Sequence, residues 1–166
     1  ASDVYKRQIG YSCATGIPYE EGFMKNRFAD RTFIMPDQKQ RESAVSMKMN
    51  PIKSTVNGKR IMIVDDSIVR GTTLKKLIAM LRKAGAKEVH VRVGSPPIIA
   101  PCYYGVDMKS RDQFIANRHS VEEIREIIGA DSLGYISIEG LIEAIGFKER
   151  DLCLSLIHIS EPTRLA

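Results

Sequence analysis

The strongest hydrophobic pattern of the chain lies between residues 60 and 94. Residues 60–66 place four apolar residues in a row before two aspartates, which predicts a central parallel strand that is buried on both faces. Apolar residues then recur with the spacing of one helix face, at Leu74, Leu77, Ile78 and Leu81. A terminating glycine follows, and then a strand with alternating valines, at Gly85, Val89, Val91 and Val93. Strand, helix and strand in this order predict a right-handed βαβ unit and hence an α/β fold.

Weaker patterns predict further elements on both sides of this unit. Short strands are expected at residues 17–24, 104–108 and 134–138. A helix is expected to begin after Ser120, because Glu123 completes a capping box and apolar residues follow with helical spacing. Another helix is expected over residues 138–145.

Residues 26–58 show no regular period. An irregular stretch of this length far exceeds the usual loop of about 4–6 residues and predicts a functional lid. Charge sets the stretch apart as well, because residues 25–60 hold nine basic and three acidic residues, a local charge of +6, while the whole chain carries +5. A positive segment attracts polyanions such as nucleic acid, acidic lipid or a phosphorylated small molecule; the alternative is a solvated basic surface.

Composition indicates an ordinary globular domain. Of the 166 residues 43% are hydrophobic, enough for a core, and no apolar run approaches the roughly 18 residues of a membrane-spanning helix. Cys13, Cys102 and Cys153 form neither a disulfide framework nor a CxxC pair, which predicts a reducing, cytoplasmic location. Residues 1–8 and 151–166 continue no neighbouring pattern and are expected to be non-native ends, which leaves residues 9–150 as the domain.

Candidate chemistry is concentrated in residues 64–73, where the first strand of the βαβ unit ends and its helix begins. Ligands of open α/β sheets bind at this crevice, and the N–H groups of a helix start favour anions. Gly71 allows a phosphate to approach the backbone closely. Hydroxyl donors beside it come from Ser67, Thr72 and Thr73. Asp65 and Asp66 would repel a phosphate, so they predict a divalent cation or ribose hydroxyls as partners; the alternative is an acidic turn that only caps the helix.

Residues 64–73 resemble the phosphoribosyl-pyrophosphate (PRPP) motif of type I phosphoribosyltransferases. The wider sequence resembles the amidophosphoribosyltransferase (glutamine PRPP amidotransferase) family from about residue 9 to 146. The matching stretches, in order, are 14–20, 25–36, 64–73, 95–97, 101–107, 120–125 and 128–131. The resemblance implies the type I phosphoribosyltransferase fold, a mostly parallel sheet flanked by helices, which this chain is expected to contain in incomplete form.

The resemblance implies a pentosyltransferase activity for the parent enzyme. Glutamine-derived ammonia displaces pyrophosphate from PRPP to give 5-phosphoribosylamine, the first step of de novo purine (IMP) biosynthesis. The ammonia comes from an N-terminal glutaminase domain that this fragment is expected to lack, so the fragment alone is expected to be inactive. The resemblance also implies purine nucleotides as inhibitors and a homo-oligomeric parent; nucleic acid and membrane are not expected partners.

The resemblance assigns roles to individual residues. Asp65 and Asp66 match the acidic pair that contacts the ribose hydroxyls and Mg²⁺. The 5′-phosphate loop corresponds to Ser67, Ile68, Val69, Arg70, Gly71, Thr72 and Thr73. Arg31 and Lys48 fall in the flexible catalytic loop that closes over PRPP, which corresponds to residues 26–58. Cys102 matches one of four [4Fe–4S] ligands in the iron–sulfur branch of the family, and because a lone thiolate cannot hold a cluster, none is expected in this fragment.

Two other functions fit part of the pattern. A receiver-like signalling domain also begins with such a strand and acidic pair, and Asp107 lies at a tolerable distance to be its phosphoacceptor, but the Gly-Thr-Thr cradle and the residues before the strand fit it poorly. A non-catalytic PRPP-binding regulator of phosphoribosyltransferase fold is compatible with the basic segment, although no helix-turn-helix pattern accompanies it. The histidines, His90, His119 and His158, lack metal-ligand spacing and are assigned no role.

Overall fold

The computed structural model describes residues 2–25, 49–101, 114–152, 154 and 157. Its elements in chain order are α1 (Ser2–Thr15), β1 (Phe23–Lys25), β2 (Met49–Pro51), α3 (Lys53–Val56), β3 (Arg60–Asp65), α4 (Thr72–Lys83), β4 (Glu88–Val93), η3 (Ile115–Asn117), α5 (Val121–Ile128), β5 (Ser132–Tyr135), α6 (Ile138–Ile145) and η4 (Glu149–Asp151). The strand expected at residues 104–108 and most of the expected lid lie outside the described residues.

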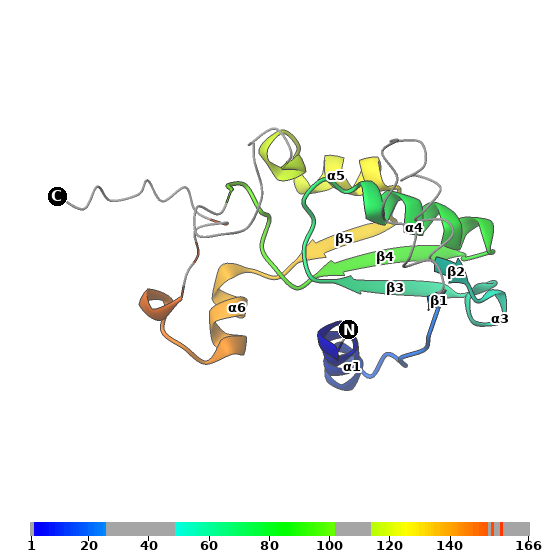
Figure 1. Cartoon of the computed structure of the whole chain (residues 1–166), viewed down its shortest axis with the longest axis horizontal. Coiled ribbons are helices and arrows are strands. Elements are labelled where there is room, and N and C mark those ends of the chain that lie inside the picture. The colour runs from blue at the N-terminus through cyan, green and yellow to red at the C-terminus, as the bar shows by residue number, and fades with distance from the viewer. Residues whose placement is uncertain (1, 26–48, 102–113, 153, 155–156, 158–166) are drawn as a thin grey trace, which may run out of the picture.

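Among the described residues, three parallel strands form the main sheet, in the order β3-β4-β5. Because the strands run in the same direction, their carboxyl ends meet at one edge of the sheet. Figure 1 shows α4 and α5 together along one side of this sheet and α1 beside β3. The parallel pairing of β3 with β4 across α4 confirms the expected βαβ unit.

The core lies between the sheet and helices α4 and α5. Its strand and helix side chains are Leu74, Ile78, Leu81, Val89, Val91, Val93, Ile124 and Ile128, all buried. The alternating valines of β4 and three of the four predicted stripe residues of α4 therefore face the core, while Leu77 is partly exposed. Both periodicities predicted the correct face of their element.

The expectation that β3 is a central strand buried on both faces is wrong for the described chain. β3 is an edge strand there, and each of its residues keeps some exposure to solvent. β4 is the central strand, and its residues alternate between buried and partly exposed. On its outer side β3 meets α1, where Gln8 Nε2 donates to the Val64 carbonyl at 3.5 Å. An apolar run indicates that a strand needs cover, but it does not specify which element supplies it.

The segments before β3 are more regular than the sequence predicts. α1 includes residues 2–8, for which no element is expected. β1 is shorter and later than the strand expected at 17–24, and it pairs antiparallel with β2. Irregular structure is also the wrong expectation for residues 49–58, because β2 and α3 lie there and the Val56 side chain is fully buried. Elements of three and four residues are too short to produce a recognisable period.

The C-terminal helices follow their capping signals. Ser120 Oγ accepts from Glu123 N at 3.3 Å, and the Glu123 carboxylate accepts from Ser120 N at 2.7 Å, which confirms the capping box of α5. Ser137 Oγ accepts from Gly140 N at 3.0 Å at the start of α6. β5 begins and ends earlier than the expected strand at 134–138, because Ser137 is already the cap.

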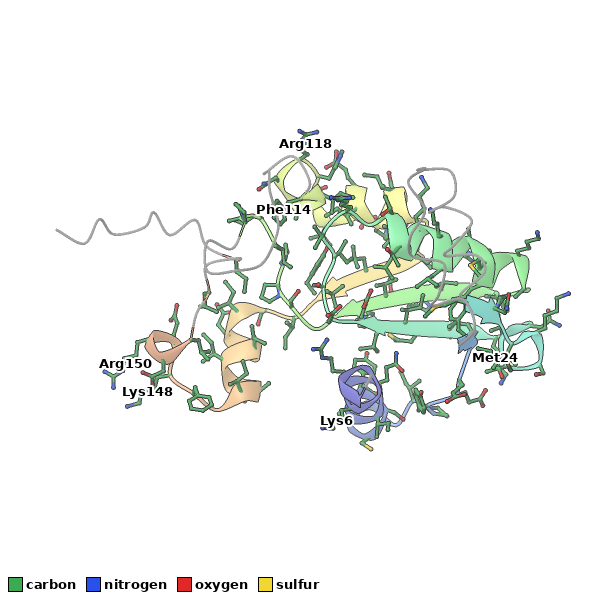
Figure 2. The ribbon with its side chains drawn as sticks, viewed as in Figure 1. Lys6, Met24, Phe114, Arg118, Lys148 and Arg150 are labelled. Atoms are coloured by element: carbon green, nitrogen blue, oxygen red, sulfur yellow. The ribbon has the colours of Figure 1, made fainter. Side chains whose placement is uncertain are left out.

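α6 differs from α4 and α5 because it buries none of its residues. It stands apart from the sheet, followed by the turn that carries Lys148 and Arg150 (Figure 2). No helix in the described ranges is long and apolar enough to cross a membrane.

Candidate active site

Two carboxylates stand at the carboxyl end of β3. Asp65 Oδ1 accepts from Asp66 N at 2.9 Å, and Asp66 Oδ1 accepts from Ser67 N at 2.9 Å. Gly94 N donates to the Asp65 carbonyl at 2.9 Å and ties the end of β3 to the end of β4. The turn therefore fixes both carboxylates at the sheet edge where ligands of parallel sheets bind.

α4 begins at this turn without a side-chain cap. Its N-cap is Gly71, and the carboxylates of Asp65 and Asp66 bond to the turn rather than to the helix. The alternative of a purely capping acidic turn is therefore wrong. The first N–H groups of α4, from Thr72 to Leu74, have no partner within the helix and point along its axis, where they and the helix dipole favour an anion.

Gly71 is required by conformation and by packing. Its φ of +72° lies in the left-handed region, which residues other than glycine adopt only at a cost in free energy. A Cβ there would lie 3.2 Å from Ile128 Cγ2 and 3.3 Å from Ile115 Cδ1. The sequence indicated only that a glycine admits a phosphate; the structure adds that the loop crosses closely over η3 and the end of α5.

The middle of the loop is anchored from inside the protein. The Ile68 side chain is 2% exposed and packs in the core, and Val69 accepts from Ile115 N through its carbonyl at 2.8 Å. Phe114, directly before η3, is fully buried (Figure 2). Ile68 can therefore offer a ligand only its backbone, while Arg70, Thr72 and Thr73 are exposed. A loop held in this way keeps its N–H groups in place without a ligand.

The electrostatic environment of the acidic pair is unusual for surface aspartates. Burial raises the pKa of the Asp65 carboxyl, and the neighbouring Asp66 charge acts in the same direction. The hydrogen bond from Asp66 N and the charge of Arg7 lower the pKa of Asp65 but do not offset burial. Burying a carboxylate beside another one disfavours its charged form, so a bound cation would relieve both effects.

Arg7 is a site neighbour that the sequence does not indicate. Its guanidinium lies 3.5 Å from Asp66 Oδ2, with both side chains about half exposed. Residue 7 belongs to the segment expected to be non-native, and nothing in its local sequence points to the loop near residue 66. The contact depends on how α1 packs beside β3.

Two further polar groups at the same sheet edge were also missed. Ser95 Oγ and the Tyr135 hydroxyl are buried without a hydrogen-bond partner in the described structure. Burial raises the pKa of Tyr135 to about 12. Tyr135 reaches this edge through the register of β5, in which it lies opposite Val93. The sequence predicted the end of a strand at Ser95 and the beginning of a strand at Tyr135, and their proximity depends on strand order.

The acidic pair fits magnesium better than it fits a metal held by protein ligands alone. Within the described ranges no group of three or more His, Cys, Asp or Glu side chains gathers. Mg²⁺ commonly uses one or two carboxylates and completes its shell with water and substrate phosphates, which suits Asp65 and Asp66 beside an anion-binding helix start. Cys13 is a free, exposed cysteine in the described chain. Arg31, Lys48, Cys102 and Asp107 lie outside the described residues.

Comparison with known proteins gives consistent matches. A model of the phosphoribosyl transferase domain matches residues 26–94. Amidophosphoribosyltransferase from Methanothermobacter thermautotrophicus is 58% identical over 157 residues, 95% of this chain and 33% of that protein. The Bacillus subtilis amidophosphoribosyltransferase is 52% identical over 161 residues, 95% of this chain and 34% of that protein. The solved B. subtilis glutamine PRPP amidotransferase complexed with ADP and GMP has a TM-score of 0.81 at 52% identity, over 95% of this chain and 36% of that one.

Fold, loop and family match together define a type I phosphoribosyltransferase domain. The chain spans about a third of the length of the curated relatives that it matches. Over 95% of its length it is similar to amidophosphoribosyltransferases, as the motifs in its sequence indicate. The family match excludes the receiver-like interpretation, and the matched length exceeds the range of about 9–146 expected from the motifs alone.

Proposed function

We propose that this domain binds PRPP and Mg²⁺ at residues 65–73 and carries the phosphoribosyl transfer of an amidophosphoribosyltransferase. Ammonia derived from glutamine would displace pyrophosphate and give 5-phosphoribosylamine, the first step of de novo purine biosynthesis. The observation that carries the proposal is the loop itself: two carboxylates directly beside an uncapped start of α4. Relatives named amidophosphoribosyltransferase at more than 50% identity support it.

The two halves of the loop bind different parts of PRPP. The N–H groups and hydroxyls at Thr72 and Thr73 bind the 5′-phosphate, where the helix dipole favours negative charge. Asp65 and Asp66 accept hydrogen bonds from the ribose hydroxyls and hold the cation. Mg²⁺, when bound, neutralises charge on the departing pyrophosphate. Ammonia is already a nucleophile, so these residues act by positioning the ribose rather than by proton transfer.

The remaining parts of the proposal concern groups beyond the described residues. Arg31 and Lys48 are proposed to neutralise the leaving pyrophosphate, and residues 26–58 to close over PRPP and exclude water. Ammonia would come from a glutaminase domain in the same enzyme, and Cys102 would be a cluster ligand in an iron–sulfur parent. The relative complexed with ADP and GMP supports purine nucleotides as regulators. A homo-oligomer and a cytoplasmic location complete the proposal.

Substitution of the acidic pair tests the proposal in the full-length enzyme that contains this domain. Asp65→Asn with Asp66→Asn keeps the shape of both side chains and removes their charge. We expect ammonia-dependent formation of 5-phosphoribosylamine to fall at least a thousandfold, with an unchanged circular dichroism spectrum. Glu139→Gln with Glu143→Gln is the matched control, because both side chains are exposed in α6 and belong to no part of the loop. Near-native turnover of the double variant with Mg²⁺ would show that the assignment is wrong.

A further inference from the structure

A polar hollow lies at the opposite end of the sheet from the loop. Its volume is about 510 Å³, within the range of roughly 300–1,000 Å³ that is usual for small-molecule sites. One wall is formed by α3 and the residue that follows it, and the other by the end of α4 and the two residues that follow it. The lining residues are Lys53, Ser54, Asn57, Lys83, Ala84 and Gly85. Figure 1 shows α3 and the end of α4 side by side at the amino end of β3. Because β3 is six residues long, about 20 Å separates this hollow from the loop at residues 65–73.

The walls of the hollow are fixed by backbone contacts. Gly58 N donates to the Gly85 carbonyl at 2.8 Å, and Lys87 N donates to the Lys59 carbonyl at 2.8 Å. Gly85 has a φ of +100°, and any Cβ at that position would collide with Asn57 Oδ1. Val56, on the other side of α3, is fully buried and anchors the short helix in the core. The two segments therefore hold one another in place, with the amide of Asn57 between them.

The hollow carries positive charge that no acidic side chain of the described residues neutralises. Its lining contains two lysines and no carboxylate. Other cations at this end of the sheet have partners: Lys59 Nζ lies 2.8 Å from Glu20 Oε2, and Arg82 pairs with Asp131. Lys53 and Lys83 have no ion pair with any residue in the described ranges. Two exposed ammonium groups facing one hollow raise the local concentration of anions.

The negative end of the α4 dipole is weakened, because three of the last four carbonyls of the helix already accept hydrogen bonds. Ala84 N donates to Met80, Gly85 N to Arg82, and Ala86 N to Leu81, each at 3.0 Å. These bonds satisfy carbonyls that would otherwise face the hollow without a partner and repel an anion. The donors left at the hollow are the two ammonium groups, the Ser54 hydroxyl and the Asn57 amide.

We propose that this hollow is an anion site that binds a multiply charged phosphate compound, distinct from the loop at residues 65–73. Lys53 and Lys83 act as point charges on separate phosphate oxygens, as lysines do in phosphate sites. Ser54 and Asn57 donate hydrogen bonds to the same group. The proposal does not depend on the proposed function, since it uses no residue of the PRPP loop.

The test uses the 166-residue chain and inorganic pyrophosphate without Mg²⁺, at constant ionic strength, followed by two-dimensional amide NMR. We expect saturable shifts of the Asn57, Gly58 and Gly85 signals. The variant Lys53→Gln/Lys83→Gln should weaken this binding at least tenfold. The control Lys75→Gln/Lys148→Gln removes the same charge from exposed positions outside the hollow and should leave it within twofold.

The outcomes separate this site from the loop. Asp65→Asn/Asp66→Asn should leave the shifts at Gly58 and Gly85 unchanged, whatever it does to signals from residues 66–74. Absence of saturable shifts at the hollow would overturn the proposal. So would equal weakening in both lysine variants, which would indicate only diffuse attraction. A third contrary result is a lower melting temperature of the Lys53/Lys83 variant with unchanged pyrophosphate binding, since the lysines would then serve only the end of α4.

Discussion

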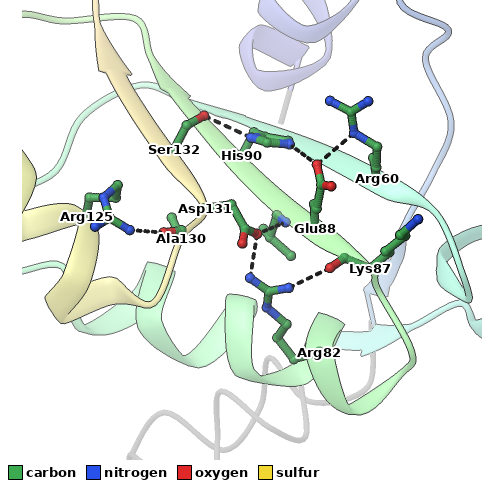
Figure 3. Close-up of polar contacts among 10 residues, drawn as sticks. Arg60, Arg82, Lys87, Glu88, His90, Arg125, Ala130, Asp131 and Ser132 are labelled. Carbon is green, nitrogen blue, oxygen red and sulfur yellow. Dashed lines mark hydrogen bonds and ion pairs between the residues drawn. The ribbon is translucent and has the colours of Figure 1, made fainter.

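The two ends of the parallel sheet differ in whether the polar groups on and beside the strands have hydrogen-bond partners. At the amino end, Asp131 Oδ2 accepts from Val89 N and from Arg82, each at 2.5 Å (Figure 3). Glu88 Oε2 there meets Arg60 Nε at 2.7 Å and His90 Nε2 at 3.0 Å, and His90 Nδ1 reaches Ser132 Oγ at 2.9 Å. At the carboxyl end, the first turn of α4 is uncapped and two buried hydroxyls have no partner in the described chain.

This contrast distinguishes polar groups that stabilise the fold from polar groups that are available to bind a ligand. A buried donor or acceptor without a partner costs free energy, so a fold keeps such groups where something else binds them. At the amino end, the polar side chains on the strands bond to one another, and the open donors there belong to the hollow between α3 and the end of α4. At the carboxyl end, the strand ends themselves and the start of α4 are open to a ligand. The variants below test whether the two ends differ in this way.

The largest expected loss of stability comes from replacing Ile68, the buried side chain that anchors the loop at the carboxyl end of the sheet. Ile68→Ala should lower the free energy of unfolding by about 2–4 kcal/mol, because it leaves a cavity under the loop. Ile145→Ala in α6 removes the same atoms from a side chain that is 44% exposed and should cost less than about 1 kcal/mol. Urea denaturation of both variants measures the difference. Similar losses would show that the loop is not held from the core.

Two aspartate substitutions compare the ends directly. Asp131→Ala leaves Val89 N without its acceptor and should cost about 1–3 kcal/mol. Asp65→Asn should cost nothing or stabilise the domain, because burial disfavours the charge that it removes. Thermal unfolding at neutral pH checks the pair. A destabilised Asp65→Asn with an unaffected Asp131→Ala would reverse the assignment of the two ends.

A matched pair of glycines separates strain from packing at the loop. Gly71 and Gly146 have nearly the same positive φ, +72° and +75°. A Cβ at Gly146 would meet nothing within 4 Å, whereas one at Gly71 would press on Ile115 and Ile128. Gly146→Ala should therefore cost about 1 kcal/mol from conformation alone, and Gly71→Ala about 1 kcal/mol more. Equal losses in chemical denaturation would contradict the close crossing of the loop over α5.

The smallest expected effect is on the pH dependence of stability. The hydrogen bond from Val89 N and the pairing with Arg82 lower the pKa of Asp131, and the contacts to His90 and Arg60 lower that of Glu88. A lowered folded pKa contributes stability that is present above the ordinary pKa values of 3.8 and 4.5 and is lost as the pH falls from these values through the lowered pKa of the folded state. Asp65 has the opposite sign, because its raised pKa contributes stability at low pH that disappears as the pH rises.

Urea midpoints measured from pH 6 down to pH 3 check these signs. The wild-type chain should lose stability over that range, and Asp131→Asn should lose less. Asp65→Asn should show a steeper loss than the wild type, because it removes the one contribution of opposite sign among these three carboxyls. A flat profile for the wild type would mean that the amino-end contacts do not stabilise the fold.

Much of this architecture is predictable from sequence, for identifiable reasons. Leu74, Ile78 and Leu81 and the valines of β4 sit in long regular patterns, and Ser120 with Glu123 is a local signal. The candidate loop was found because its carboxylates, glycine and hydroxyls are consecutive in the chain. Ser95, Tyr135 and Arg7 were missed because strand register and the packing of α1 bring them near the loop. The edge position of β3 was missed because an apolar run does not encode strand order.

The inward-pointing side chain of Ile68 has a consequence for how this domain can change over generations. A ligand at the loop meets only the peptide groups at this position, while the side chain contacts the protein interior. Replacements among aliphatic side chains at residue 68 alter how tightly the interior packs but present the same N–H and carbonyl to the substrate. Sequence drift there is therefore filtered by foldability and not by substrate choice. Gly71 has no such freedom, since one added carbon disturbs both the interior and the route of the chain past the substrate.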